Sequence, residues 1–408
     1  MKSCCVIGLG YIGLPTAALL SQNLYKVIGV DINLQIVKKI NSGRAHLFEP
    51  DLDEILYESI KKGNIIASEI PRKADVFIIT VPTPFKDEHK KIPVPNIDYV
   101  LAATESICPY LQKGNLIILE STSPVGTTKK VADLIFEKTS LDIDQVNIAY
   151  CPERVMPGSI LKELVSNDRV IGGLTKKANI AAKLFYKSFC KGEIYTTNSS
   201  TAELVKLSEN AFRDVNIAFA NELSMICHKL DIDSNELISL ANNHPRVNIM
   251  NPGCGVGGHC IAVDPWFIAS QNPEITKIIQ VAREVNLNKI QWVLDQVLNI
   301  IDRIEKELGR KIIIGIMGLT YKPDVDDLRE SPALKITNEL IKKKFNILVC
   351  EPNIKKHNEI VLSSLEHVVK NADHLFFLVA HSEFKEIDLS KYNFNEYCGI
   401  LNSHEDSN

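Results

Sequence analysis

The chain has 408 residues, which is typical of two or three domains, and 45% of them are hydrophobic, enough for a sizeable core. Its formal net charge is −4 without any basic block, so we expect neither nucleic acid nor a membrane surface as a partner. The ten cysteines follow no regular spacing, and no apolar stretch reaches the roughly 18 residues that a membrane span needs. These features predict a soluble, cytoplasmic protein without a disulfide framework.

Short apolar runs alternate with amphipathic segments over the first 190 residues. The runs are typical of strands, and the segments between them have helical periodicity. Such alternation predicts a parallel sheet with helices on both faces. The expected strands are 4–7, 26–30, 76–80, 116–119 and 146–149, and the clearest helices are 13–21, 34–41 and 127–138.

Long segments of helical periodicity dominate residues 201–303, interrupted by a Gly/Pro-rich stretch at 251–259. From residue 311 the alternation resumes, with strands expected at 311–317, 346–350 and 375–379 and a helix at 332–343. We therefore predict an α/β protein with three parts. These are an N-terminal Rossmann-type domain (1–190), a central helical region (191–305) and a smaller Rossmann-like domain (306–408).

A glycine-rich turn follows the first expected strand and opens the first helix. Gly8 permits the tight turn, Gly10 lets the backbone approach a pyrophosphate, and Gly13 lets helix and strand pack closely. Asp31 ends the second strand, where a carboxylate accepts hydrogen bonds from ribose hydroxyls and repels a 2′-phosphate. The pattern predicts a site for NAD rather than NADP; the alternative is a tight turn without a ligand.

Two further strand ends point to the same edge of the predicted sheet. Thr83 follows the strand at 76–80, and Thr122 follows the strand at 116–119. Ligands of open parallel sheets bind beyond the carboxyl ends of the strands, so both hydroxyls are candidate contacts for a cofactor or water. The alternative is that these residues only shape turns and cap helices.

The predicted helix from residue 201 to 224 has a polar stripe beside its apolar one. Lys206, Asn210 and Arg213 lie at helical spacing, and neither cation has an acidic partner four residues on. A polar stripe is usually a solvated face. This mixture of cations and an amide could instead line a site for an anionic, polyhydroxylated substrate.

The stretch Asn251–Cys260 contains four glycines and ends in a cysteine. Its flexible backbone could present several N–H groups to an anion, and these would favour the thiolate of Cys260. Asp264 follows and could orient the thiol or handle water. A metal site using Cys254, His259 and Cys260 is disfavoured by their spacing, and a buried structural cysteine is the remaining alternative.

Several segments together resemble the UDP-glucose/GDP-mannose dehydrogenase family over nearly the whole chain. The resemblance implies an N-terminal NAD domain, a long central helix that builds a homodimer, and a C-terminal domain that holds UDP. The segments are Ala149–Gly158, Lys206–Asn216, Asn243–Ile249, the glycine stretch continuing into Asp264–Phe267, and Gly318–Pro323 with Asp326–Pro332.

The resemblance also implies a reaction, the NAD-dependent oxidation of the C6 alcohol of a UDP-sugar to a carboxylate. Cys260 would capture the intermediate aldehyde as a thiohemiacetal, which a second NAD oxidises to a thioester for hydrolysis. The other implied roles are stabilisation of oxyanions by Lys206 and Asn210, and binding or activation of water by Glu153, Thr122 and Asp264.

Binding residues carried over from the family form two sets, and no metal is implied. Arg246 is expected to reach a substrate from the partner subunit. The cofactor set is Gly8, Gly10, Tyr11, Ile12, Gly13, Asp31, Thr83, Thr122 and Arg329. The substrate set is Arg154, Val155, Lys206, Asn210, Arg213, His244, Arg246, Gly257, Tyr321 and Lys322.

Three positions depart from the pattern of UDP-glucose enzymes. Pro157 replaces a second acid, and His259 replaces a small polar residue, which favours UDP-N-acetyl-D-mannosamine as the substrate, for surface polysaccharide synthesis. Ile36 removes one contact to the adenosine. The alternatives are UDP-N-acetylglucosamine or UDP-glucose as substrate, a two-electron alcohol dehydrogenase, and a nucleotide-sugar sensor without catalysis.

Overall fold

The computed structural model describes residues 2–23, 25–87, 90–156 and 158–400, so Pro157 lies outside the described residues. The chain divides into two compact units. The first consists of residues 1–208 and 266–271, and the second of residues 209–265 and 272–408. Among the described residues, no helix has the length and apolar character needed to cross a membrane.

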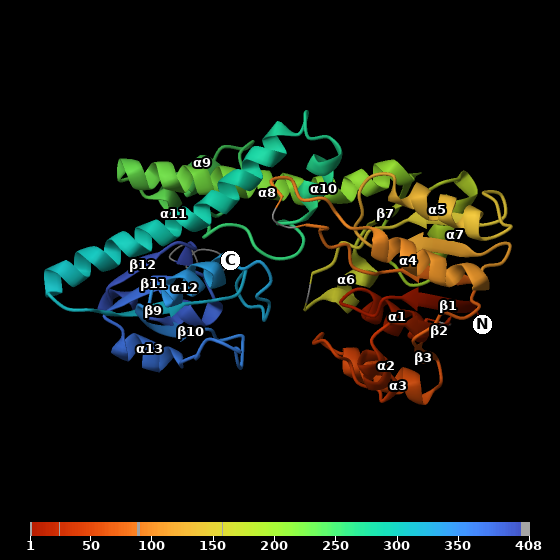
Figure 1. Cartoon of the computed structure of the whole chain (residues 1–408), viewed down its shortest axis with the longest axis horizontal. Coiled ribbons are helices and arrows are strands. Elements are labelled where there is room, and N and C mark those ends of the chain that lie inside the picture. Colours follow the sequence, from red (N-terminus) through yellow and green to blue (C-terminus); the bar gives the residue numbers. More distant parts are fainter. Residues whose placement is uncertain (1, 24, 88–89, 157, 401–408) are drawn as a thin grey trace. The chain divides into compact units, whose positions relative to one another are not determined.

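The described part of the first unit contains an eight-stranded sheet (Figure 1). Its order is β3-β2-β1-β4-β5-β6-β7-β8, and all neighbours are parallel except β6 and β7. The first six strands have the doubly wound order of dinucleotide-binding folds. The bounds are β1 Lys2–Ile7, β2 Tyr25–Val30, β3 Ile65–Ser68, β4 Val76–Ile79, β5 Leu116–Leu119, β6 Asn147–Tyr150, β7 Arg169–Gly173 and β8 Ile194–Asn198.

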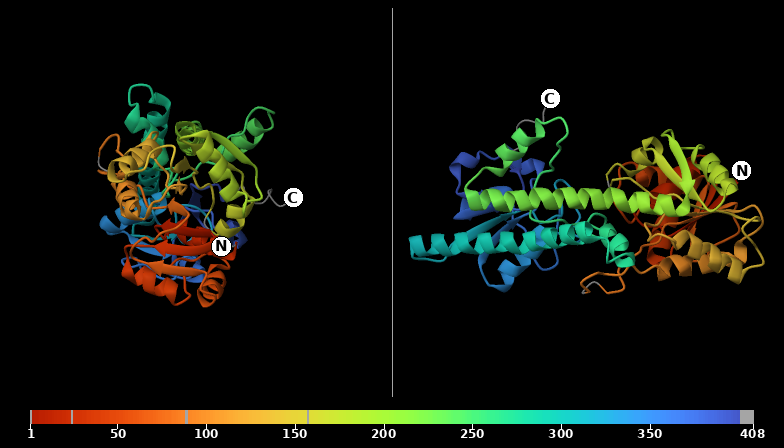
Figure 2. Two further views of the ribbon diagram at one scale, coloured as in Figure 1. Left: turned by 90° about the vertical axis from the view of Figure 1, so that its right-hand side faces the viewer. Right: turned by 90° about the horizontal axis from the view of Figure 1, so that it is seen from above.

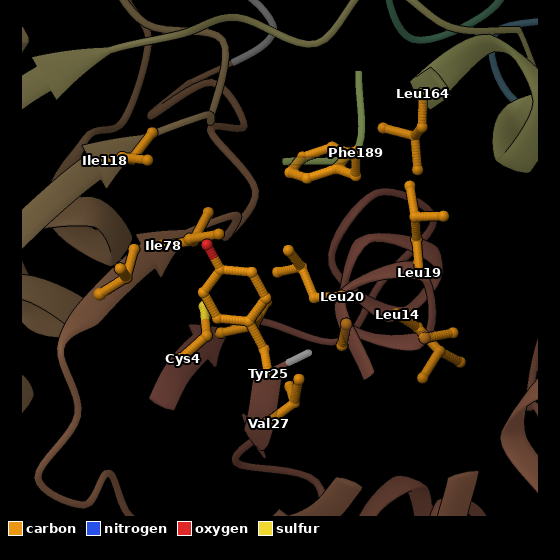
Figure 3. Packing of buried hydrophobic residues seen from close by; sticks show 14 of the residues in the cluster. Cys4, Leu14, Leu19, Leu20, Tyr25, Val27, Ile78, Ile118, Leu164 and Phe189 are labelled. Atoms are coloured by element: carbon orange, nitrogen blue, oxygen red, sulfur yellow. The ribbon is translucent and has the colours of Figure 1, made fainter. Parts of the chain in front are cut away.

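Successive side chains of a strand point to opposite faces of the sheet. Because the strands carry apolar residues at successive positions, each face packs into its own hydrophobic cluster. Cys4 and Val6 face one hydrophobic cluster, and Cys5 and Ile7 face the other. Figure 3 shows the first cluster, in which Tyr25 packs among side chains of neighbouring elements. The helices are α1 Gly13–Gln22, α2 Leu34–Asn41, α3 Leu52–Lys61, α4 Asp98–Ile107, α5 Thr127–Lys138, α6 Ile160–Ser166 and α7 Lys176–Tyr186.

The long helix α8 (Ser199–Leu230) begins in the first unit and continues into the second. There, its residues from Glu209 onward lie beside the second long helix, α11 (Lys277–Leu308) (Figure 2). A buried ion pair of 2.7 Å between Arg283 and Asp214 joins them. Two shorter helices, α9 (Ser234–Asn242) and α10 (Asp264–Gln271), flank the glycine-rich stretch. The predicted helical region between the two α/β parts is therefore present.

The C-terminal sheet has the order β10-β9-β11-β12 with parallel neighbours throughout the described residues. Ile314 and Ile316 face a cluster that includes α11 and α12, whereas Met317 and Leu375 face α13. The confirmed fold class is α/β, with two sheets and long helices between them in the sequence. The predicted parallel order holds for the first six strands and for the C-terminal sheet, whereas β7 and β8 run antiparallel to the first six strands. The bounds are β9 Ile313–Met317, β10 Asn346–Cys350, β11 His374–Phe377, β12 Phe394–Glu396, α12 Pro332–Lys342 and α13 Leu365–Asn371.

Candidate functional site

The glycine turn between β1 and α1 is closely packed on one side and open on the other. Gly8 has φ of +91°, and its N–H donates to the carbonyl of Val30 at 2.8 Å. A Cβ on Gly13 would lie 1.8 Å from the carbonyl oxygen of Gly8, whereas a Cβ on Gly10 would meet no atom within 4 Å. The turn therefore has the packing that the sequence predicted, with free space beside Gly10 that fits a pyrophosphate.

Asp31 follows β2 at the same edge of the sheet. Its Oδ2 accepts from the N–H of Leu9 at 3.1 Å, and its Oδ1 accepts from the N–H of Asn33 at 2.9 Å. The carboxylate is half-buried, so it keeps an accessible side for ribose hydroxyls. Tyr11 is 41% exposed beside the turn, and Ile12 directly precedes α1. These residues fit NAD, which accepts a hydride when it is bound.

The two threonines at the neighbouring strand ends are joined to each other. The hydroxyl of Thr83 donates to the backbone carbonyl of Thr122 at 2.7 Å. Thr83 thus has a role in shaping the loops, the alternative that its sequence context left open. The side chain of Thr122 remains half-buried at the carboxyl end of β5.

Glu153, after β6, belongs to a buried charged cluster that the sequence did not reveal. Its Oε2 pairs with Arg169 of β7 at 3.1 Å, and its Oε1 accepts from the N–H of Arg154. The hydroxyl of Tyr186 donates to Glu120 at 2.5 Å. Burial and the charge of Glu153 raise the pKa of Glu120 to about 7, against the opposing effects of Arg169 and Tyr186. The guanidinium of Arg169 therefore forms an ion pair with Glu153 and also acts on the pKa of Glu120.

Two predicted substrate contacts lie directly after Glu153. Arg154 donates from Nη1 to the carbonyl of Asp168 at 3.3 Å. Val155 packs partly buried against the hydrophobic cluster that contains β1. Packing therefore accounts for at least part of the role of Val155.

The glycine stretch of the second unit is fixed at several points. The N–H of Gly253 donates to the side chain of Asn221 at 2.9 Å, and the N–H of Gly258 donates to the carbonyl of Arg329 at 2.9 Å. A Cβ on Gly257 would lie 2.7 Å from the carbonyl oxygen of Glu330. Gly258 has φ of +80°, a conformation that favours glycine. The stretch is therefore an ordered loop.

Cys260 stands at the end of this loop, in the turn that leads into α10. Its carbonyl accepts from the N–H groups of Val263 and Asp264 at 3.0 and 2.8 Å. The carboxylate of Asp264 accepts from Nδ2 of Asn210 at 2.5 Å, and both of these side chains are buried. Cys260 is only half-buried, whereas eight of the other nine cysteines are buried. Partial exposure suits a reacting thiol.

Asn210 and Lys206 lie one helical turn apart on α8, as their spacing predicted. Arg213, farther along α8, is exposed. Burial raises the pKa of the Tyr321 hydroxyl, with Asp327 and Cys260 adding to the rise and Arg329 and Arg213 opposing it. Within the second unit, the charges of Cys260 and Arg213 thus both act on Tyr321, in opposite directions.

A hollow of about 410 Å³ opens at the carboxyl ends of β9 and β11. Its lining includes the start of the glycine loop, Thr320, Tyr321 and Lys322. The Lys322 ammonium lies 5.8 Å from the ring centre of Tyr321. A ring, a cation and backbone N–H groups are the chemistry that suits a nucleoside diphosphate.

The turn after β9 repeats the geometry of the turn after β1, but the acid beside it, Glu351, has different contacts from those of Asp31. Oε2 of Glu351 accepts from the N–H of Leu319 at 2.7 Å and of Thr320 at 3.1 Å, and it lies 3.1 Å from Nε2 of His381. Burial would raise the pKa of Glu351, but the hydrogen bonds from His381 and Leu319 outweigh it and lower the pKa. These contacts enclose Glu351, so it is unsuited to bind ribose as Asp31 can.

The remaining predicted contacts lie on exposed segments of the second unit. Nδ1 of His244 accepts from the N–H of Arg246 at 3.3 Å, and both side chains are exposed. Arg329 makes a bidentate ion pair with Asp327, with distances of 2.6 and 2.9 Å. Among the described residues, no group of three or more His, Cys, Asp or Glu side chains is arranged to hold a metal ion.

Sequence and structure comparisons connect these features to one family. The NAD binding, central and UDP binding domains of the UDP-glucose/GDP-mannose dehydrogenase family match residues 2–190, 200–288 and 315–396. The UDP-N-acetyl-D-mannosamine dehydrogenase of Campylobacter jejuni is 52% identical, with 95% of this chain and 97% of that protein covered.

Two further relatives show how far the similarity extends. The NDP-N-acetyl-D-galactosaminuronic acid dehydrogenase of Ralstonia nicotianae is 46% identical, with 95% of this chain and 92% of that protein covered. The structure of UDP-D-ManNAc dehydrogenase from Pyrococcus horikoshii has a TM-score of 0.88 at 39% identity, with 98% and 96% covered. The chain is therefore an NAD-dependent dehydrogenase that belongs to the UDP-glucose/GDP-mannose dehydrogenase family.

Proposed function

We propose that this enzyme oxidises UDP-N-acetyl-D-mannosamine to UDP-N-acetyl-D-mannosaminuronate with two NAD, in the cytoplasm, for the synthesis of a surface polysaccharide. The observation that carries the proposal is the half-buried Cys260 on an ordered glycine loop, followed by the buried Asn210–Asp264 pair. The 52% identity to a UDP-N-acetyl-D-mannosamine dehydrogenase supports the choice of sugar.

The chemistry proceeds through a covalent intermediate on Cys260. The C6 alcohol first loses a hydride and a proton to give an aldehyde, and the thiolate adds to the aldehyde carbon to form a thiohemiacetal. Loss of a second hydride and of the hydroxyl proton gives a thioester. Water then forms a bond to the carbonyl carbon and gives up two protons, the C–S bond breaks, and the products are the carboxylate and the free thiolate. Each NAD accepts one hydride, so the four electrons require two cofactors.

The chain supplies groups suited to the charges that develop. We assign Lys206 and Asn210 to the oxyanions of the alkoxide and the tetrahedral intermediates, where fixed donors act most strongly. Glu153, Thr122 and Asp264 are assigned to binding and deprotonating water. The ion pair of 3.1 Å with Arg169 supports this role for Glu153, because it fixes the position of the carboxylate.

The substrate would be held largely by the second unit. Tyr321 and Lys322 line the hollow beside the glycine loop, and Gly257 would offer its backbone. Arg213, His244 and Arg246 are assigned to the sugar and the pyrophosphate, for which guanidinium groups provide bidentate contacts. The exposure of His244 and Arg246 agrees with a role that needs a ligand or a second subunit.

We further propose that the enzyme is a homodimer, with Arg246 acting on the substrate of the partner subunit. An apolar hollow of about 310 Å³ lies between α8 and α11 in the second unit. Phe219, Ile278 and Val281 at this hollow are 53%, 73% and 54% exposed, which is unfavourable in water and supports a second copy as the covering partner. Analytical ultracentrifugation of the wild type and of Phe219→Glu tests this interface.

The substrate is tested by following NADH formation with UDP-N-acetylmannosamine, UDP-N-acetylglucosamine and UDP-glucose. We expect the highest kcat/KM with the first and about two NADH per sugar, because both oxidations occur before release. A second candidate is an N-acetylgalactosamine nucleotide, favoured by the 46% identity to the Ralstonia protein. Faster oxidation of any other sugar refutes our choice of substrate.

The nucleophile is tested with Cys260→Ser. A hydroxyl in this position is a much weaker nucleophile, so the variant should form aldehyde but little uronate. Uronate formation at the wild-type rate would contradict the assignment of Cys260.

A further inference from the structure

The cysteine loop is fastened to one face of α8 at two points. Before the loop, the N–H of Gly253 donates to Oδ1 of Asn221 at 2.9 Å; after it, Asp264 accepts from Asn210 at 2.5 Å. Asn210 and Asn221 are eleven residues apart on α8, which corresponds to about 16 Å along the axis. Both of these attachments to α8 therefore depend on a carboxamide side chain of the helix.

Asn221 is also the end of a chain of buried polar side chains between α8 and α11. Its Nδ2 donates to Oδ1 of Asn286 at 2.8 Å, and Nδ2 of Asn286 donates to Oδ1 of Asp214 at 2.8 Å. Arg283 completes the chain with its 2.7 Å ion pair to the same oxygen of Asp214. The exposed fractions of Asn221, Asn286 and Asp214 are 0%, and that of Arg283 is 2%.

Packing alone does not require such a chain between two helices. Apolar side chains of similar size stabilise a buried contact as well as or better than an enclosed ion pair does. The chain does have a consequence for the loop, because it fixes the carboxamide of Asn221 in the orientation that accepts from Gly253. Without this acceptor the N–H of Gly253 would lose its hydrogen bond to α8.

The loop itself has little intrinsic stiffness. Gly253, Gly255, Gly257 and Gly258 lower the barrier to other backbone conformations, and Gly255 already has φ of +135°. A Cβ on Gly255 would lie 2.9 Å from the carbonyl oxygen of Asn286, so the loop also rests against the residue that orients Asn221. The loop is thus held against α8 through the side chain of Asn221 and lies close to the backbone of α11 at Asn286.

We propose that Asn221 is a positioning residue for the nucleophile, and that Asn286, Asp214 and Arg283 hold it in place. This inference rests on the proposed function of Cys260. The first hydride transfer needs no thiol, whereas capture of the aldehyde and the second oxidation need the sulfur at bonding distance from the aldehyde carbon. Loosening the loop should therefore slow the second oxidation selectively.

The test separates the two oxidations in one turnover. Excess wild-type enzyme or Asn221→Leu is mixed with UDP-N-acetylmannosamine and NAD, quenched in acid at intervals, and analysed for alcohol, aldehyde and uronate by mass spectrometry. For Asn221→Leu we expect the alcohol to disappear within about twofold of the wild-type rate and uronate to form at least about tenfold more slowly, since small displacements of reacting groups have effects of this size.

Three further variants make the result interpretable. Ser224→Ala removes a hydroxyl bonded to Lys289 one turn from Asn221 without touching the loop, and it should keep the wild-type ratio of the two rates. Asn221→Ser keeps a polar group if the leucine variant does not fold. Asp214→Asn weakens the far end of the chain and should show the same selective effect, but smaller.

Two outcomes would overturn the inference. Equal slowing of both oxidations in Asn221→Leu and Asn221→Ser would mean that Asn221 only supports the folded state, and wild-type uronate formation would mean that the loop does not need it. A failure of the underlying function is distinguishable, because Cys260→Ser would then produce uronate whatever Asn221 variants do.

Discussion

Replacing Glu120 by glutamine tests how two buried carboxyl groups, Glu120 and Glu153, beside the guanidinium of Arg169 affect the stability of the first unit. Glu120 is 3% exposed; its Oε1 accepts from Tyr186, and its Oε2 has no hydrogen-bond partner among the described residues. Burial and Glu153 together raise the pKa of Glu120 from 4.5 to about 7, despite Arg169 and Tyr186. Burial raises the pKa of two thiols, Cys151 and Cys4, and the charge of Glu120 adds to the rise in both.

The sign of the effect on stability follows from proton binding. Between pH 4.5 and about 7 the folded protein binds more protons at Glu120 than the unfolded chain does, so stability falls as the pH rises through this window. At about 1.4 kcal/mol per pKa unit, the loss approaches about 3 kcal/mol above pH 7. Glu120→Gln keeps an acceptor for Tyr186 and cannot ionise, so it should avoid this loss.

Calorimetric unfolding of the wild type and Glu120→Gln from pH 5 to pH 8.5 measures the difference. We expect similar unfolding temperatures at pH 5 and a variant that is more stable by up to about 6–12 °C at pH 8.5, given about 2–4 °C per kcal/mol for a unit of this size. Glu203→Gln is a matched control. Glu203 accepts from the N–H groups of Gly126 and Thr128, so the amide should destabilise the protein. A pH-independent difference for Glu120→Gln would refute the reasoning.

Three other changes have defined outcomes. Gly13→Ala would place a Cβ 1.8 Å from the carbonyl oxygen of Gly8, so calorimetric titration should find NAD binding lost and UDP binding kept. Glu351→Gln replaces an acceptor of two backbone N–H groups and His381, and we expect UDP affinity to fall about tenfold while NAD affinity is unchanged. Burial lowers the pKa of Lys289 to about 8, so the wild type should gain thermal stability relative to Lys289→Met between pH 8 and 10, and no relative gain would contradict this.

Periodicity predicted the elements that carry strong local patterns. The helices α2 and α5 begin and end where they were expected, and the strands β5 and β10 do as well. Elements whose burial is set by distant neighbours were not predicted, among them β3 and β8. The residues of β8, Ile194–Asn198, are mostly exposed or half-buried and polar, and they form a strand because β7 supplies the hydrogen-bond partners. Pairing of this kind is a tertiary effect without a local signal.

Some residues of the candidate site could likewise be predicted from the sequence, and others could not. The special backbone positions of Gly13 and Gly258 could be predicted, because glycine is the residue type that permits a close approach or a positive φ. Arg169, Tyr186 and Asn221 were not, since each is an ordinary residue of a strand or helix until folding encloses it beside a charge or a loop. Asn221 is buried on α8, and its hydrogen bonds with Gly253 and Asn286 distinguish it from a residue that merely fills space.

The two Rossmann-type turns show why function has to be argued from side chains rather than from the fold. In each, the first glycine of the turn donates to the end of the neighbouring strand, Gly8 to Val30 at 2.8 Å and Gly318 to Cys350 at 2.9 Å. In each, an acid follows that strand. Asp31 is half-buried and can still accept from a ribose, whereas Glu351 is 5% exposed and enclosed by its own turn and His381. The longer side chain of Glu351 and its contact with His381 therefore leave this acid as a structural residue, whereas Asp31 keeps an accessible oxygen.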